Sequence, residues 1–174
     1  MPTADLIIEP WRTNCRIRRL LVGNLPPEIW GDALPGLPRR TVRMVAAHLH
    51  NSRGGWINTL GVPLGIERPP RVDGFKATRR EVLAALPASE RGIADILRAG
   101  LRAGGRVPAT RKYVWRNLPL DVGHVMAYVV AHEAHHRGQL ILAARQLGAR
   151  LPREVTDRIW WWQPPRKPVK KAAV

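Results

Sequence analysis

A chain of 174 residues is long enough for one domain with a sizeable core and too short for two ordinary domains. Its single cysteine, Cys15, excludes an intrachain disulfide and a cysteine-based metal site, and no apolar run or secretory signal indicates a membrane or exported protein, so a cytoplasmic one is expected. The net charge of +16 is compatible with nucleic acid binding, but most of the arginines are scattered singly, and the one dense basic run, residues 166–171, is typical of a solvated tail.

The first half of the chain predicts two helices separated by a loop. Apolar residues recur at helical spacing over residues 10–24, and residues 30–38 are expected to form a loop. A second helix begins after Thr41, a good N-cap, and reaches about Leu60. No segment shows the alternating pattern of a strand, so an all-α fold is expected.

The second half predicts two further long helices. Thr78 and Glu81 have the spacing of a capping box, which opens a third helix that ends by Gly104. Asp121 is placed to cap a fourth helix that reaches Leu147.

These four helices, followed by a short fifth one, predict an antiparallel four-helix bundle. We expect residues 1–163 to form this single domain and residues 164–174 to be a basic tail rich in Pro and Lys. One or two residues of the run Trp160, Trp161 and Trp162 are expected to pack over the open end of the bundle, and the alternative is a partner surface. Cys15 is expected to be a packed thiol rather than a nucleophile.

Two histidines lie on the core-facing stripe of the fourth predicted helix. At spacings of three and four, this stripe contains Val122, Val125, Val129, His132, His136, Leu140, Ala143 and Leu147. Side chains four apart on a helix are neighbours, roughly 5–6 Å apart at Cβ, so both imidazoles can reach one ion. Burying both without a shared partner would be costly. The pair therefore predicts a divalent metal site, for which zinc, nickel or iron is suitable.

A third ligand is expected from the second helix, because one helix offers only a narrow arc of directions to an ion. His48 lies roughly 80° from the centre of that helix's apolar stripe, and His50 lies roughly 120° away on the other side. His48 is therefore favoured, with His50 as its substitute.

The segment from His132 to His136 also matches the His-Glu-x-x-His pattern of zinc proteases, in which the glutamate is a general base. No histidine follows His136, and no strand is predicted for binding a peptide, so protease activity is not favoured. We expect Glu133 to pair with Arg137 at the helix surface, and we retain it only as a secondary catalytic candidate.

The sequence resembles the DinB superfamily of four-helix-bundle metal proteins over about residues 10–162. The resemblance is carried by AHLHNSRGGWI in the second helix, HEAHHRGQL in the fourth, LGARLP and the closing Trp segment. It implies one metal ligand from the second helix and two from the fourth, which fall on His48, His132 and His136. It also implies a homodimer and, as in some relatives, a low-molecular-weight thiol such as bacillithiol or mycothiol.

The favoured function is a metal-dependent transferase or hydrolase that acts on a small molecule. Three neutral imidazoles would leave the ion its full charge and open positions, so a bound thiol or water would become more acidic. Arg53 and Arg137 are candidates for holding the carboxylates of a thiol cofactor or substrate. The alternative is a non-catalytic module that binds nucleic acid or an acidic partner through its positive charge.

Overall fold

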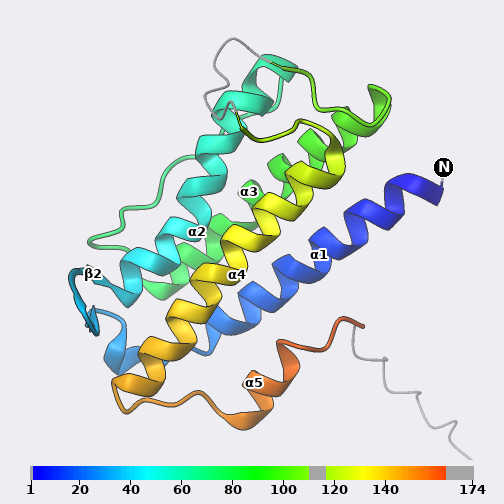
Figure 1. Ribbon diagram of the computed structural model, residues 1–174. Helices are drawn as coiled ribbons and strands as arrows, with labels where there is room; N and C mark the ends of the chain where they lie inside the picture. Colours follow the sequence, from blue (N-terminus) through cyan, green and yellow to red (C-terminus); the bar gives the residue numbers. More distant parts are fainter. Residues whose placement is uncertain (1, 110–116, 164–174) are drawn as a thin grey trace, which may run out of the picture.

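The computed structural model describes residues 2–109 and 117–163, and the predicted tail, residues 164–174, lies outside them. The described part is mainly helical (Figure 1). Its helices are α1 (Pro2–Gly23), α2 (Val42–Trp56), α3 (Arg79–Arg102), α4 (Val122–Gln146) and α5 (Arg153–Arg158), with short turns η1 (Pro27–Ile29), η2 (Ile57–Gly61) and η3 (Val62–Leu64). A two-stranded sheet is formed by β1 (Ala33–Leu34) and β2 (Leu37–Thr41). None of the described helices combines the length and the apolar character needed to cross a membrane.

The four long helices lie side by side (Figure 1). Helix α1 packs against α3 and α4, and α2 packs against the same two helices. Helix α5 lies outside this group, next to α1. The expectation of a predominantly helical fold is therefore confirmed.

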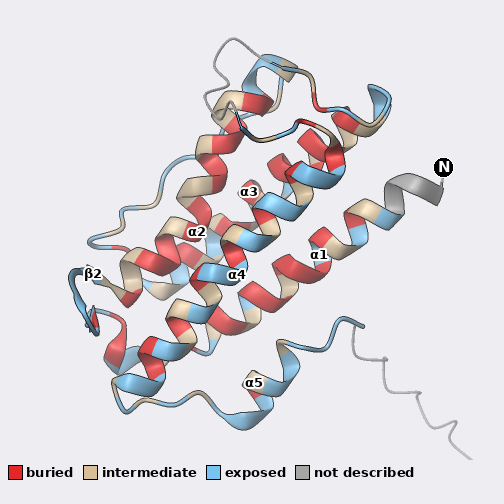
Figure 2. Ribbon diagram, in the orientation of Figure 1, coloured by how far each residue is buried: buried red, intermediate tan, exposed pale blue. Residues whose placement is uncertain are grey.

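The core lies on the faces that the long helices turn toward one another (Figure 2). Six of the eight positions of the predicted stripe are buried, and the other two, His132 and Leu147, are half-buried. The hairpin of β1 and β2 and most of α5 are exposed. Burial of these apolar faces, at about 25 cal/mol per Å², is the main force that holds the helices together.

The predicted helix starts are confirmed by their caps. Thr41 Oγ1 accepts a hydrogen bond from the backbone N–H of Met44 at 3.2 Å. Thr78 and Glu81 form the full capping box, with each side chain bonded to the other residue's backbone N–H. Asp121 caps α4 by accepting from the backbone N–H three residues later.

Two predictions in the first half of the chain need correction. Helix α1 begins at Pro2, so Pro10 lies inside it and does not mark its start. The segment predicted as a loop contains the hairpin, in which Ala33 pairs with Thr41 and Gly36 has the positive φ that the turn requires. The hairpin gave no strand pattern because β2 is almost entirely exposed and has no buried face to alternate with.

Candidate metal centre

Three histidines from two helices converge on one point. Each offers a ring nitrogen, and these nitrogens all lie within 4.8 Å of one another. The Nε2 atom of His132 is 3.3 Å from Nε2 of His48 and 3.3 Å from Nε2 of His136. No second cluster of three or more such donors occurs in the part of the chain that the structure describes.

The helices place these rings at the edge of the core. His132 and His136 follow the buried Val129 on α4, one turn apart, while His48 lies on α2 between two buried residues. His136 is only 5% exposed, and the other two are half-buried. The cluster is therefore shielded on the core side and accessible on the other.

A neighbouring amide fixes the orientation of the His136 ring. The Oε1 atom of Gln139 lies 2.7 Å from Nδ1 of His136, and an amide oxygen can only accept, so Nδ1 carries the proton. The lone pair of Nε2 then faces the other two histidines. Such an outer hydrogen bond is typical of histidines that bind metals.

The electrostatic environment keeps all three imidazoles neutral at pH 7. Burial lowers the pKa of His48 to about 4, and the neighbouring histidines and the positive charges of Arg40 and Arg71 act in the same direction. Burial is also the main reason that the pKa values of His132 and His136 are lowered. Neutral imidazole is the form that binds metal ions, so the cluster is ready to act as a ligand set.

The donor set fits a transition metal. Three imidazole nitrogens suit zinc, nickel, iron or copper, whereas magnesium and calcium prefer oxygen ligands. The Nδ1 atom of His132 is buried and has no hydrogen-bond partner among the described residues, so an ion at Nε2 would be the principal partner of this ring.

Two different surfaces border the histidines. On one side, the indole of Trp56 meets the His132 ring edge-on, with 5.0 Å between the ring centres, and Tyr128 packs against the same indole. On the other side lies a cavity of about 190 Å³, which we call the His48 cavity, lined by Arg40, Met44, His48, Asn51, Arg71, Gly74 and Phe75.

His50, the predicted substitute for His48, lies elsewhere. Its Nε2 atom donates to the carbonyl oxygen of Pro70 at 2.8 Å, and its Nδ1 atom is 3.1 Å from the hydroxyl of Ser89. Both ring nitrogens are therefore engaged away from the other histidines, and of the two alternatives on α2 only His48 joins the cluster.

The prediction that Glu133 forms a surface pair with Arg137 is wrong, because Glu133 is fully buried. Its carboxylate accepts hydrogen bonds from Arg18 at 2.7 Å, from Asn14 at 2.6 Å and from Arg53. Arg137 reaches Asn14 instead. The carboxylate is thus committed to the interior and is not free to serve as a general base.

Arg53 and Arg137, the predicted carboxylate-binding residues, do not line the His48 cavity. Arg53 is fully buried, with its guanidinium 4.4 Å from the ring centre of Trp11. The basic residues beside the cluster are Arg40 and Arg71, which sequence reasoning missed. They belong to a hairpin and a loop, where no helical periodicity indicates the direction of a side chain.

The remaining expectations concern Cys15 and the tryptophan run. Cys15 is buried, and burial raises the pKa of its thiol well above the ordinary value, so the packed thiol is confirmed. Trp160, Trp161 and Trp162 are 77%, 54% and 49% exposed, so none of them is buried, although Trp161 lines a cavity together with Ile17 and Leu20 of α1. Arg16 holds their main chain by donating to the carbonyl oxygens of Trp161 and Trp162.

Comparison with known proteins agrees with the resemblance seen in the sequence. The family model described as the DinB family matches residues 1–167. No curated protein and no solved structure gives a match. The family match covers nearly the whole chain and includes both helices that carry the histidines, and on this ground the protein belongs to the DinB family.

Proposed function

We propose that this protein binds one divalent transition-metal ion through His48, His132 and His136 and uses it in a transferase or hydrolase reaction on a small molecule. The observation that carries the proposal is the meeting of three neutral imidazoles from two helices. A bound ion would supply Lewis acidity, which lowers the pKa of a coordinated thiol or water.

The chain's own residues would set how the ion is held. Gln139 fixes the His136 ring, and the buried face of α4 keeps His132 and His136 in register. Because no carboxylate is in the ligand set, the ion would keep its full positive charge. That charge favours an anionic form of whatever binds next to it.

Metal analysis of the purified full-length protein tests the site. We expect one equivalent of zinc or cobalt after loading and dialysis of the wild type. His132→Ala and His48→Ala should each lose most of it, because two imidazoles seldom retain an ion. His124→Ala is the matched control, since His124 is exposed and bonds only to Asp121 nearby. Equal metal in His132→Ala and the wild type would overturn the proposal.

Three further proposals rest on the family likeness. We infer that the four long helices form an antiparallel bundle. We infer too that the protein is a homodimer, and sedimentation of the purified protein can measure this oligomeric state. We also infer that a low-molecular-weight thiol is the cofactor. A thiol-dependent turnover that disappears in His132→Ala would support the last of these.

A further inference from the structure

Two unpaired guanidinium groups lie in the His48 cavity. Arg40 and Arg71 line it, and no acidic side chain does. Neither arginine forms an ion pair within the described residues, whereas ion pairs occupy Arg12, Arg18, Arg19, Arg53, Arg98 and Arg153. Both are exposed, so their guanidiniums are available to a ligand.

Both charges act on the histidine cluster. After burial and the other imidazoles, Arg40 and Arg71 are the next causes that lower the pKa of His48, and Arg40 also lowers that of His136. With an ion bound, two guanidiniums and a dication would share this region. Glu133, the carboxylate next to His132 in the sequence, is already engaged by Arg18 and Arg53. The lining of the His48 cavity contains no carboxylate, and an anionic ligand would supply the counter-charge.

The position of Arg71 is fixed by α2, although its own segment has no regular structure. The Asn51 amide donates to the carbonyl oxygen of Val72 at 2.8 Å and accepts from its N–H at 3.0 Å. His50 bonds to the carbonyl oxygen of Pro70 on the other side of Arg71. Both sequence neighbours of Arg71 are thus fastened to the helix that carries His48.

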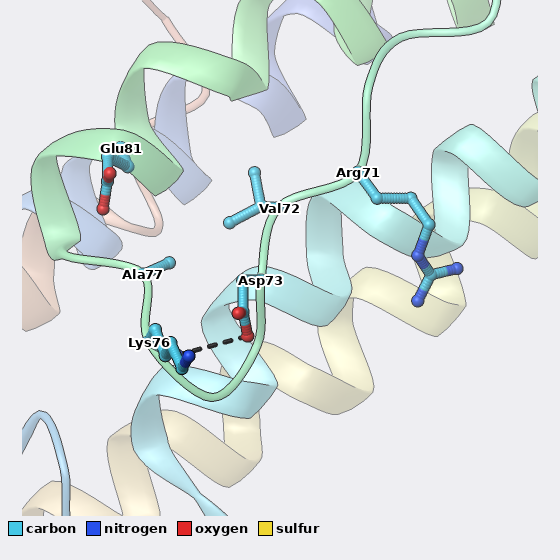
Figure 3. Close-up of a pocket in the computed structure, with 6 residues that line it drawn as sticks. All are labelled: Arg71, Val72, Asp73, Lys76, Ala77 and Glu81. Atoms are coloured by element: carbon cyan, nitrogen blue, oxygen red, sulfur yellow. Dashed lines mark hydrogen bonds between the residues drawn. The ribbon is translucent and has the colours of Figure 1, made fainter.

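Figure 3 shows the consequence for the direction of the side chain. Arg71 points away from Asp73 and Lys76, which lie in a turn held by the hydrogen bond from the Lys76 N–H to Asp73, and away from Glu81 on α3. Asp73 and Glu81 line a neighbouring cavity that Arg71 also borders, and neither acid lines the His48 cavity. Among the described residues, neither acid forms an ion pair with Arg71.

Arg40 is held by a different element. It precedes Thr41, the N-cap of α2, at the end of β2. The hairpin continues past it, since the N–H of Val42 donates to the carbonyl oxygen of Asp32 at 3.0 Å. Arg40 and Arg71 therefore reach the cavity from two independently anchored segments.

We propose that Arg40 and Arg71 form a clamp for the carboxylate of a small substrate or cofactor whose other end reaches the metal centre. This inference rests on the proposed function and specifies its ligand. Met44 and Phe75 in the same cavity provide apolar contacts for the hydrocarbon between the two ends. At about 190 Å³ the cavity has room for roughly six water-sized groups, which suits a short chain.

Simple thiols can test the clamp without knowledge of the natural ligand. Cobalt-loaded protein would be titrated with 3-mercaptopropionate, which is anionic, with 2-mercaptoethanol, which is neutral, and with 2-aminoethanethiol, which is cationic. Cobalt–thiolate absorption reports binding. We expect the anionic thiol to bind at least tenfold more tightly than the neutral one, and the cationic thiol to bind most weakly. A phosphate-bearing thiol of similar length shows whether the clamp selects carboxylate or any anionic group.

Variants then assign the preference to the two arginines. Arg40→Gln and Arg71→Gln should each reduce the preference for the anionic thiol to about threefold or less, with cobalt content and 2-mercaptoethanol affinity unchanged. Arg68→Gln is the control, because Arg68 is an exposed residue of the same loop that does not line the cavity.

The results of these titrations distinguish a failure of the arginine clamp from a failure of the metal centre. If cobalt binds but the wild type does not distinguish the anionic thiol from the neutral one, the clamp is wrong and the metal centre stands. If the preference survives in both Gln variants, the assignment to Arg40 and Arg71 is wrong. If the wild type binds no cobalt, the metal centre fails and the clamp fails with it.

Discussion

His132 and Glu133 are neighbours in the sequence, yet their side chains lie in two different environments. Successive side chains on a helix point about 100° apart, so His132 faces His48 of α2 while Glu133 points into the core between α1 and α2. His132 meets His48, and Glu133 meets Asn14 and Arg18. A single turn of α4 therefore carries a candidate metal ligand and the centre of a buried ionic network.

Replacing Glu133 should destabilise the fold without removing the metal. In Glu133→Gln, Arg53 would lose its buried counter-charge and Arg18 would keep only Glu90. Breaking a buried ion pair costs about 3–5 kcal/mol. Burial lowers the pKa of Arg18, but the carboxylates of Glu133 and Glu90 outweigh it and raise that pKa, as expected of a charge-paired guanidinium. Urea denaturation measures the loss, and metal per folded molecule should stay unchanged.

An exposed ion pair gives the control for this variant. Glu9 and Arg12 pair at 3.4 Å with both side chains more than half exposed. Glu9→Gln should therefore cost no more than about 1 kcal/mol. If the two variants lose similar stability, the buried network around Glu133 stabilises the folded protein no more than an exposed ion pair does.

The histidine cluster was predictable because two of its three members follow a local rule. His132 and His136 are four apart on an apolar stripe, which the sequence displays directly. The choice between His48 and His50 was harder, because both lie well off the centre of their stripe and only the packing of α2 decides between them. The partner of Glu133 was predicted incorrectly because Arg18, with which it pairs, is 115 residues away, whereas Arg137 has the spacing of a surface pair.

At the level of the elements, two faces of α2 make different contacts. His48 faces α4 and the metal centre. Arg43, His50 and Asn51 hold the loop of residues 66–77 by bonding to its main chain. The loop therefore has a defined path without strands or helices of its own.

Removing the Asn51 side chain should release this loop. Asn51→Ala deletes both hydrogen bonds to Val72 and leaves its main-chain groups unpaired, at a cost of about 1–3 kcal/mol. Trypsin should then cleave after Arg71, which is followed by Val72, faster than in the wild type. Ser52→Ala is the control, because the Ser52 hydroxyl contacts only its own helix. Equal cleavage rates in the two variants would show that Asn51 does not hold the loop.

Helices were easier to predict than the hairpin for a physical reason. Each long helix after α1 begins at a side chain that caps it, and this chemistry is visible in the sequence. The hairpin has little apolar surface to bury, so its strands are set by main-chain pairing and by Gly36. Arg40 was missed as a cavity residue for that reason.

For the whole molecule, the distribution of positive charge is more informative than its total of +16. Arg18 and Arg53 are fully buried and neutralised within the helices. Arg40 and Arg71 border the metal centre without an acidic partner among the described residues. Part of the excess of positive charge, which by itself would suggest nucleic-acid binding, is thus buried inside the protein or belongs to the candidate site.

The pH dependence of folding should reflect the buried histidines. The folded-state pKa of His48 is about 4, below the ordinary value of 6.5, so the unfolded chain binds the proton more readily. This contribution to stability is present above pH 6.5 and is lost as the pH falls toward 4. We expect urea midpoints of the metal-free wild type to decrease over this interval.

The His48→Gln variant should show a shallower decrease than the wild type over the same pH interval, because it lacks one of the titrating groups. Identical pH profiles for the two proteins would contradict the role assigned to His48.

Because residues 66–77 are held on α2 from outside the bundle, the candidate metal ligands and the proposed Arg71 contact lie in separate stretches of sequence. The histidines belong to packed helices, where most changes disturb the core, while Arg71 sits on an outer segment tied down by a few side chains. Under the proposed clamp, exchanging that segment for another of suitable length would alter the ligand preference and leave the packed helices in place.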